Sequence, residues 1–113
     1  MIKNYINGEL VEAVSGQFFD NYDPSEGTPF DIIPDSDERD IELAVKAAEK
    51  AFPLWSTTPV EERSAMMMKI ASLVRRDIGE FSRAECVDNG KPLTLAKTVD
   101  IPRAIRNLEF FAS

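Results

Sequence analysis

Apolar residues recur at spacings of three and four through much of the stretch 58–92. The members of this stripe are Met66, Met67, Ile70, Leu73, Val74, Ile78, Phe81 and Ala84. Such spacing places side chains on one face of an α-helix, while most charged residues of the same stretch fall on the opposite face. The pattern predicts one long amphipathic helix, which requires a partner surface for its apolar face.

Local signals bound this helix on both sides. Thr58 precedes Pro59, and Glu61 follows three positions after Thr58, which is typical of a capped helix start. Asn89 or Gly90 can adopt the left-handed conformation that ends a helix, and Pro92 prevents its continuation. Gly79 is a poor helix former inside this predicted helix, so a bend is expected there.

The first 34 residues predict two β-hairpins. Short strands within residues 2–12 flank Asn7 and Gly8, the strongest short hairpin signal, because both residues tolerate positive φ. A second strand pair, 17–23 and 28–34, flanks a turn built from turn-forming residues.

A further helix is predicted to begin after Ser36 or Asp37, with acidic residues near its positive end, and to stop at Pro53, with Trp55 packing beyond. Its expected inner face consists of Ile41, Ala44, Val45, Ala48, Ala51 and Phe52. Apolar residues at helical spacing thus follow the two hairpins directly.

A last helix is predicted with Asp100 as its cap and Pro102 in its first turn. Its apolar face comprises Ile101, Ile105, Leu108 and Phe111. No stop signal precedes residue 113, so we expect a fragment, a truncated product or part of a longer chain. The fold class is therefore an α+β segment, with a β-hairpin region at 1–34 and three amphipathic helices in the helical region 35–113.

Composition narrows the possible functions. The 13 basic and 20 acidic residues give a net charge of −7, which disfavours binding to nucleic acid and to anionic membranes. The longest apolar run, 65–68, is too short to span a bilayer, and no signal peptide is evident. One cysteine and no intrachain disulfide fit a reducing, cytoplasmic location.

Candidate chemistry is sparse. The chain has no histidine, so it lacks the commonest general base and the commonest transition-metal ligand. Its five glycines form no phosphate-binding loop. Cys86 lies among acidic neighbours without a base, so an inert helix cysteine is the favoured interpretation. Core packing is likewise favoured over metal binding for Met66–Met68, and a helix stop explains Asp88–Gly90.

Several motifs nevertheless occur in a familiar order. They are Tyr5-Ile6-Asn7-Gly8, Tyr22-Asp23-Pro24-Ser25-Glu26-Gly27, Ala44-Val45-Lys46-Ala47-Ala48 with Ala51-Phe52 and Trp55, Pro59 with Glu62-Arg63, Asp88-Asn89-Gly90-Lys91-Pro92, and Phe110-Phe111-Ala112. Together they resemble the N-terminal region of the NAD(P)-dependent aldehyde dehydrogenase superfamily, which has an α/β fold. The stretch 96–103 and the last four residues are similar to the 2-aminomuconic and 2-hydroxymuconic semialdehyde dehydrogenase branch.

This resemblance implies that a full subunit oxidises an aldehyde to a carboxylic acid with NAD or NADP. In the family a cysteine thiolate attacks the aldehyde, hydride passes to the nicotinamide, and a glutamate activates water. The resemblance places those residues, the cofactor-binding turn and the oligomerisation part outside this segment, and Cys86 does not match the nucleophile. No catalytic or cofactor-binding residue is therefore assigned, and residues 1–113 are expected to be the N-terminal part of the cofactor-binding domain.

Two partner predictions follow from the same resemblance. The rest of the subunit covers the helices, and the complete protein forms a homo-oligomer. Many family members also hold a structural monovalent cation, and the positions that match its ligands are Asn21, Tyr22 and Asp88. The alternative function, from a different class, is a stand-alone helical interaction module or a truncated isoform without catalysis, which would cover its apolar faces with a partner.

Overall fold

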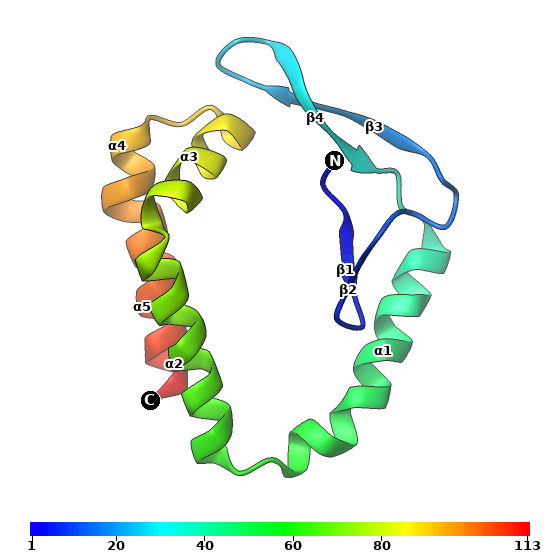
Figure 1. Ribbon diagram of the computed structural model, residues 1–113, viewed down its shortest axis with the longest axis vertical. Helices are drawn as coiled ribbons and strands as arrows, with labels where there is room; N and C mark the ends of the chain where they lie inside the picture. Colours follow the sequence, from blue (N-terminus) through cyan, green and yellow to red (C-terminus); the bar gives the residue numbers. More distant parts are fainter. The chain divides into compact units, whose positions relative to one another are not determined.

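The computed structural model describes residues 1–113 (Figure 1). The strands are β1 (Asn4–Ile6), β2 (Glu9–Val11), β3 (Phe18–Asp23) and β4 (Thr28–Pro34). The helices are α1 (Glu38–Thr57), α2 (Val60–Arg76), α3 (Ile78–Asn89), α4 (Leu93–Leu95), the π-helical turn η1 (Ala96–Asp100) and α5 (Ile101–Ala112). This order confirms the predicted α+β class.

The chain divides into two compact units. The first comprises Met1–Tyr22 and Gly27–Thr57, and the second comprises Asp23–Glu26 and Thr58–Ser113. The turn between β3 and β4 therefore groups with the helices that follow residue 58.

Both predicted hairpins are present in the structure. Strands β1 and β2 pair antiparallel, and Asn7 and Gly8 at their turn have φ of 54° and 81°. Two consecutive residues in the left-handed region match the right-handed twist of the flanking strands, which explains why this dipeptide closes the hairpin. Strands β3 and β4 form a second two-stranded sheet.

Helix α1 extends past the predicted stop at Pro53, so that prediction was wrong. Proline cannot donate to the carbonyl of Glu49, but it does not prevent the next residues from adopting helical dihedrals. The side-chain hydroxyls of Ser56 and Thr57 donate to the Pro53 carbonyl, at 3.2 and 3.0 Å. The last turns bend away from the long first part of the helix (Figure 1).

The expected inner face of α1 is not buried in the structure. Ile41 and Phe52 are each 64% exposed, Trp55 is exposed too, and Asp40 is the buried residue of this helix. No other element of the first unit covers the apolar stripe. The periodicity correctly identified a helix, but the surface that would bury its apolar side is not within this unit.

The single long helix predicted for residues 58–92 is two helices, α2 and α3. The break falls at Asp77, which has φ −103° and ψ 26°, and not at Gly79. The Asp77 N–H still donates to the Leu73 carbonyl, while the Asp77 carbonyl accepts the first amides of α3. The Arg76 guanidinium binds the Asp77 carboxylate at 2.6 Å. Asp77 thus ends one helix and caps the next.

Helix α2 begins one residue later than the Thr58 cap predicted. Pro59 is its N-cap and makes no side-chain cap hydrogen bond. At the far end, Gly90 has φ 76°, and its N–H donates to the Cys86 carbonyl at 2.8 Å, so the predicted left-handed stop is confirmed.

Asp100 directly precedes α5, as predicted, but it makes no side-chain cap hydrogen bond. Asp100 has helical dihedrals, φ −70° and ψ −54°, inside a continuous run from α4 through η1 to α5. Pro102 cannot donate to the carbonyl of Thr98, and its ring would crowd that carbonyl in a regular α-helix. A wider π-helical turn at Ala96–Asp100 relieves this crowding without ending the helix.

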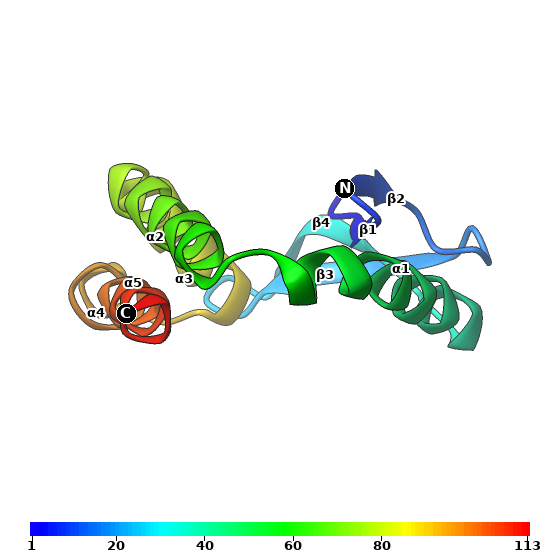
Figure 2. The same ribbon diagram turned by 90° about the horizontal axis from the view of Figure 1, so that it is seen from below.

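The second unit is built around α2 and α5, which lie side by side and antiparallel (Figures 1 and 2). Ala71 of α2 and Ile105 and Ala112 of α5 are buried. The Ser64 hydroxyl donates to the Ala112 carbonyl, and Arg75 pairs with Glu109 at 2.6 Å. Small residues at the contact let the two helices approach closely.

The rest of this unit leaves much apolar surface exposed. Phe110 and Phe111 are 71% and 74% exposed and contact each other edge to face. Met66 is exposed as well, so its assignment to a packed core was wrong, while Met67 is half-buried. None of the helices combines the length and the apolar composition needed to cross a bilayer.

Candidate functional site

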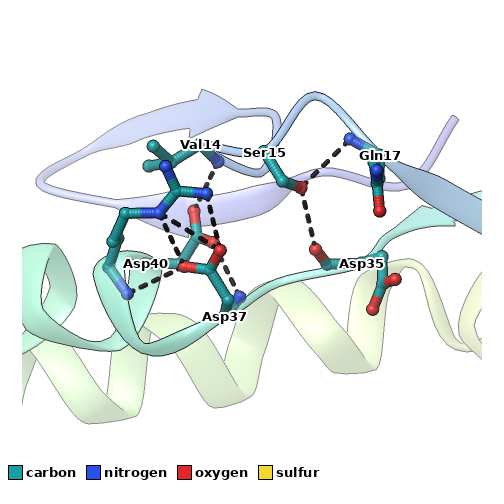
Figure 3. Close-up of polar contacts among 7 residues, drawn as sticks. Val14, Ser15, Gln17, Asp35, Asp37 and Asp40 are labelled. Atoms are coloured by element: carbon teal, nitrogen blue, oxygen red, sulfur yellow. Dashed lines mark hydrogen bonds and ion pairs between the residues drawn. The ribbon is translucent and has the colours of Figure 1, made fainter.

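A buried carboxylate organises the beginning of α1 (Figure 3). Asp40 is only 4% exposed and accepts two backbone hydrogen bonds, from the N–H of Val14 at 2.9 Å and from the N–H of Asp37 at 3.0 Å. One oxygen therefore holds the segment after β2, and the other closes the first turn of the helix. Asp40 joins two parts of the first unit that are 26 residues apart.

Asp37 completes a reciprocal cap with Asp40. Its carboxylate accepts the N–H of Arg39 at 2.9 Å, which satisfies one of the free amides of the first helical turn. The Arg39 guanidinium binds the same carboxylate at 2.7 Å. These contacts, the Arg39 side chain first and its backbone amide second, hold the pKa of Asp37 below its ordinary value. The three-residue spacing of the two aspartates was the sequence signal for this cap.

A second set of contacts ties residues 15–17 to the segment just before α1 (Figure 3). The Ser15 hydroxyl donates to the Asp35 carbonyl at 3.1 Å and accepts the N–H of Gln17. The Asp35 N–H donates to the Gln17 carbonyl at 2.9 Å. Within the acidic cluster at 35–40, the carboxylates of Asp37 and Asp40 are engaged in backbone capping.

An apolar cavity of about 460 Å³ lies in the same unit, between the first hairpin and α1. Ile6, Val11 and Leu43 line its walls. Its charged lining residues are two acids and two lysines, Glu12, Asp40, Lys46 and Lys50. Because the signs balance and Asp40 is fully engaged, the cavity has no net charge that would select an ionic ligand.

The loop after α3 makes a close backbone contact with the turn Asp23–Glu26. A Cβ added at Gly90 would lie 3.0 Å from the Pro24 Cβ and 3.5 Å from the Ser25 nitrogen. Gly90 therefore meets two demands, a left-handed φ and the absence of a side chain. The sequence indicated the first of these demands but gave no sign of the second.

We expect Gly90→Ala to lower the free energy of unfolding by about 2 kcal/mol, from left-handed backbone strain and the contact with Pro24. Gly27→Ala is the matched control, because Gly27 also has a positive φ of 70° but nothing lies within 4 Å of its added Cβ. Urea unfolding followed by circular dichroism measures the free energy of unfolding of both variants. Equal losses in the two variants would contradict a role for the close contact.

Lys91 follows Gly90 and forms the centre of a charged cluster. Its ammonium lies 2.7 Å from Asp100 Oδ2 and 2.9 Å from Glu85 Oε1, and it is one-quarter exposed. The hydrogen bonds to Asp100 and then to Glu85 raise the pKa of Lys91 above its ordinary value. Asn89 Nδ2 also donates to Glu85, at 2.7 Å. The sequence did not predict this cluster, because Lys91 and Asp100 come close only when the backbone of η1 is in place.

Cys86 is a free, half-buried cysteine on α3. With no histidine in the chain, no side chain of the usual type could serve as its base. The backbone carbonyl of Cys86 accepts the Gly90 N–H. The interpretation of Cys86 as an inert helix cysteine stays a prediction.

The residues predicted to hold a monovalent cation lie in separate units. Asn21, which is half-buried, and Tyr22 belong to β3 in the first unit, and Asp88 belongs to the last turn of α3 in the second. No group of three or more acidic or thiol side chains is placed to hold a metal ion. The cation site stays a prediction, since its expected ligands include backbone carbonyls.

The chain does not fit a dinucleotide cofactor. Helix α1 is the helix that follows a strand, as a dinucleotide site would require. Asp37 directly precedes it and Glu38 and Asp40 lie in its first turn, so their charges would repel a pyrophosphate at this N-terminus. The glycines with positive φ lie in hairpin and loop turns or end a helix, and none precedes a helix N-terminus. The placement of the cofactor-binding turn outside residues 1–113 stays a prediction.

Comparison with known proteins identifies the family. The aldehyde dehydrogenase family profile matches residues 10–113. The 2-aminomuconic semialdehyde dehydrogenase of Homo sapiens is 44% identical over 113 residues, which is 100% of this chain and 23% of that protein. An aldehyde dehydrogenase of Deinococcus radiodurans is 40% identical over 109 residues, 96% of this chain and 21% of that protein. The chain thus spans about a quarter of the length of the curated relatives it matches.

Solved structures show the same relationship. The NAD⁺ complex of an aldehyde dehydrogenase from Bacillus cereus matches with a TM-score of 0.94 at 35% identity, over 98% of this chain and 23% of that chain. A mutant indole-3-acetaldehyde dehydrogenase of P. syringae with bound NAD⁺ gives 0.96 at 32% identity, over 99% and 23%. Since sequence and fold agree along nearly its whole length, this chain belongs to the aldehyde dehydrogenase family.

Proposed function

We propose that the protein of which this chain is a part oxidises an aldehyde to a carboxylic acid and transfers the hydride to NAD or NADP. The observation that carries the proposal is the 44% identity along all 113 residues to a 2-aminomuconic semialdehyde dehydrogenase. The substrate class we propose is accordingly a muconic semialdehyde. NAD is favoured over NADP as the cofactor, because related structures were solved with NAD⁺.

Within that protein, residues 1–113 form the N-terminal part of the cofactor-binding domain, with the hairpin region at 1–34 and the helical region at 35–113. The exposed apolar stripe of α1 and the exposed Phe110 and Phe111 support this role. Burial of such surface is the main driving force for docking. The rest of the subunit covers these faces, and the complete protein forms a homo-oligomer in a reducing, cytoplasmic location.

The catalytic thiol, the general base and the cofactor-binding turn lie elsewhere in the subunit. We therefore expect the purified 113-residue chain to produce no NADH from NAD⁺ and an aldehyde. The assay follows NADH absorbance with a semialdehyde and with a simple aliphatic aldehyde. A related full-length aldehyde dehydrogenase serves as the positive control. Aldehyde-dependent NADH formation by the chain alone would refute the assignment of catalysis to other residues.

A structural monovalent cation bound by Asn21, Tyr22 and Asp88 is part of the same proposal. Hard oxygen donors, including backbone carbonyls, suit such an ion. A crystal of the complete protein soaked with thallium or rubidium tests it. Anomalous density at these residues is expected, and its absence would remove the site.

A stand-alone interaction module is the second candidate, and the same exposed apolar faces favour it. Intact mass spectrometry of the natural protein separates the two. A mass well above 12.7 kDa supports the dehydrogenase subunit, whereas a mass equal to it supports the module.

A further inference from the structure

The turn Asp23–Glu26 is preorganised before it meets the loop after α3. The Asp23 carboxylate accepts the Ser25 N–H at 2.8 Å and the Ser25 hydroxyl at 2.6 Å. The Ser25 hydroxyl first and the Ser25 amide second lower the pKa of Asp23 below its ordinary value. The turn therefore presents Pro24 as a fixed surface, and Gly90 is the residue that this surface contacts.

Gly90 itself has no side chain that could hold it in place. Its neighbour Lys91 supplies the anchoring contacts. The Lys91 ammonium reaches back to Glu85 on α3 and forward to Asp100 at the end of η1. The Lys91 N–H also donates to Asn89 Oδ1 at 3.1 Å. The loop is thus tied on both sides of Gly90.

We propose that the two ion pairs of Lys91 fix the position of Gly90 and thereby maintain the contact of Gly90 with the turn Asp23–Glu26. One cation shared by two carboxylates is the physical basis. When the cation is removed, Glu85 and Asp100 repel each other, and α3 and η1 move apart at the loop between them. Gly90 then loses its fixed position, and Pro24 loses its contact. The α2–α5 pair, which makes its own contacts, stays intact.

The test is NMR spectroscopy of the 113-residue chain, with the nuclear Overhauser effect between Pro24 side-chain protons and Gly90 Hα as the readout. Lys91→Met is expected to abolish this signal and to preserve the signal between Ser64 and Ala112. Lys91→Arg keeps the charge and is expected to retain both signals. Lys97→Met is the matched control, because Lys97 is an exposed lysine of η1 for which the structure shows no ion pair.

A salt series on the unsubstituted chain provides a second measurement that does not depend on a variant folding. The pairs of Lys91 are partly exposed, so added salt screens them. Selective weakening of the Pro24–Gly90 signal by salt supports the proposed role of Lys91. The proposal is overturned if the Pro24–Gly90 signal survives both Lys91→Met and high salt. It is also overturned if the Ser64–Ala112 signal is lost together with the Pro24–Gly90 signal, since Lys91 would then support the whole unit.

Discussion

Asp40→Ala is expected to lower the free energy of unfolding by about 3 kcal/mol, because two backbone amides lose a buried, charged acceptor. The amides are those of Val14 and Asp37, and the residue whose carboxylate accepts from them is only 4% exposed. Alanine has no acceptor to offer either amide. The loss affects both the helix cap and the tether to the segment after β2, so the first unit as a whole is destabilised.

Urea unfolding followed by the fluorescence of Trp55, the single tryptophan and a residue of α1, measures this effect. Glu38→Ala is the matched control: it removes the same charge from the same helical turn, but Glu38 is exposed. Asp40→Asn is expected to fall between the two, since its amide retains only one acceptor oxygen. An Asp40→Ala loss no larger than that of Glu38→Ala would show that the buried carboxylate does not hold the unit together.

Ile105→Ala is expected to lower the free energy of unfolding by about 3 kcal/mol, through lost apolar burial and the cavity left behind. Ile105 is 3% exposed and is the largest buried apolar side chain between α2 and α5. The other buried apolar residues of the second unit are alanines, namely Ala71, Ala96 and Ala112.

The free energy of unfolding of this variant is measured from the loss of the helical circular dichroism signal during a urea titration. Ile105→Val is expected to cost about 1 kcal/mol, in proportion to one lost methylene. Val99→Ala is the control, because Val99 lies in the same helical run but is exposed. If Ile105→Ala and Val99→Ala shifted the midpoint equally, the α2–α5 contact would not be the core of the second unit.

Much of the local structure was predictable from the sequence. The Asn7-Gly8 turn, the two strand pairs and the stop at Gly90 all depend on residues whose allowed dihedrals are restricted or unusually broad. Such preferences act within a few residues and do not depend on tertiary context. The series of motifs along the chain also sufficed to indicate the family, which the profile match over residues 10–113 then established.

The interruptions of the helices were not predictable in the same way. Pro53 was expected to end α1, and Asp100 was expected to begin a new helix, yet both residues lie inside helical runs. Helix α1 continues through Pro53, and a π-helical turn precedes Pro102 in the last helical run. The break falls at Asp77, which pairs with Arg76, while the helical periodicity continues through it.

Burial shows where the sequence alone was insufficient. Periodicity marks the face of a helix that is apolar, but it does not say which surface covers that face, and the stripe of α1 is exposed in this unit. The contacts Asp40–Val14, Gly90–Pro24 and Lys91–Asp100 likewise join residues that the chain path brings together. The sequence by itself thus determined the two strand pairs, the Asn7-Gly8 turn, the stop at Gly90 and the family. Only the tertiary structure decided which polar groups meet, because those contacts depend on how the backbone is placed around them.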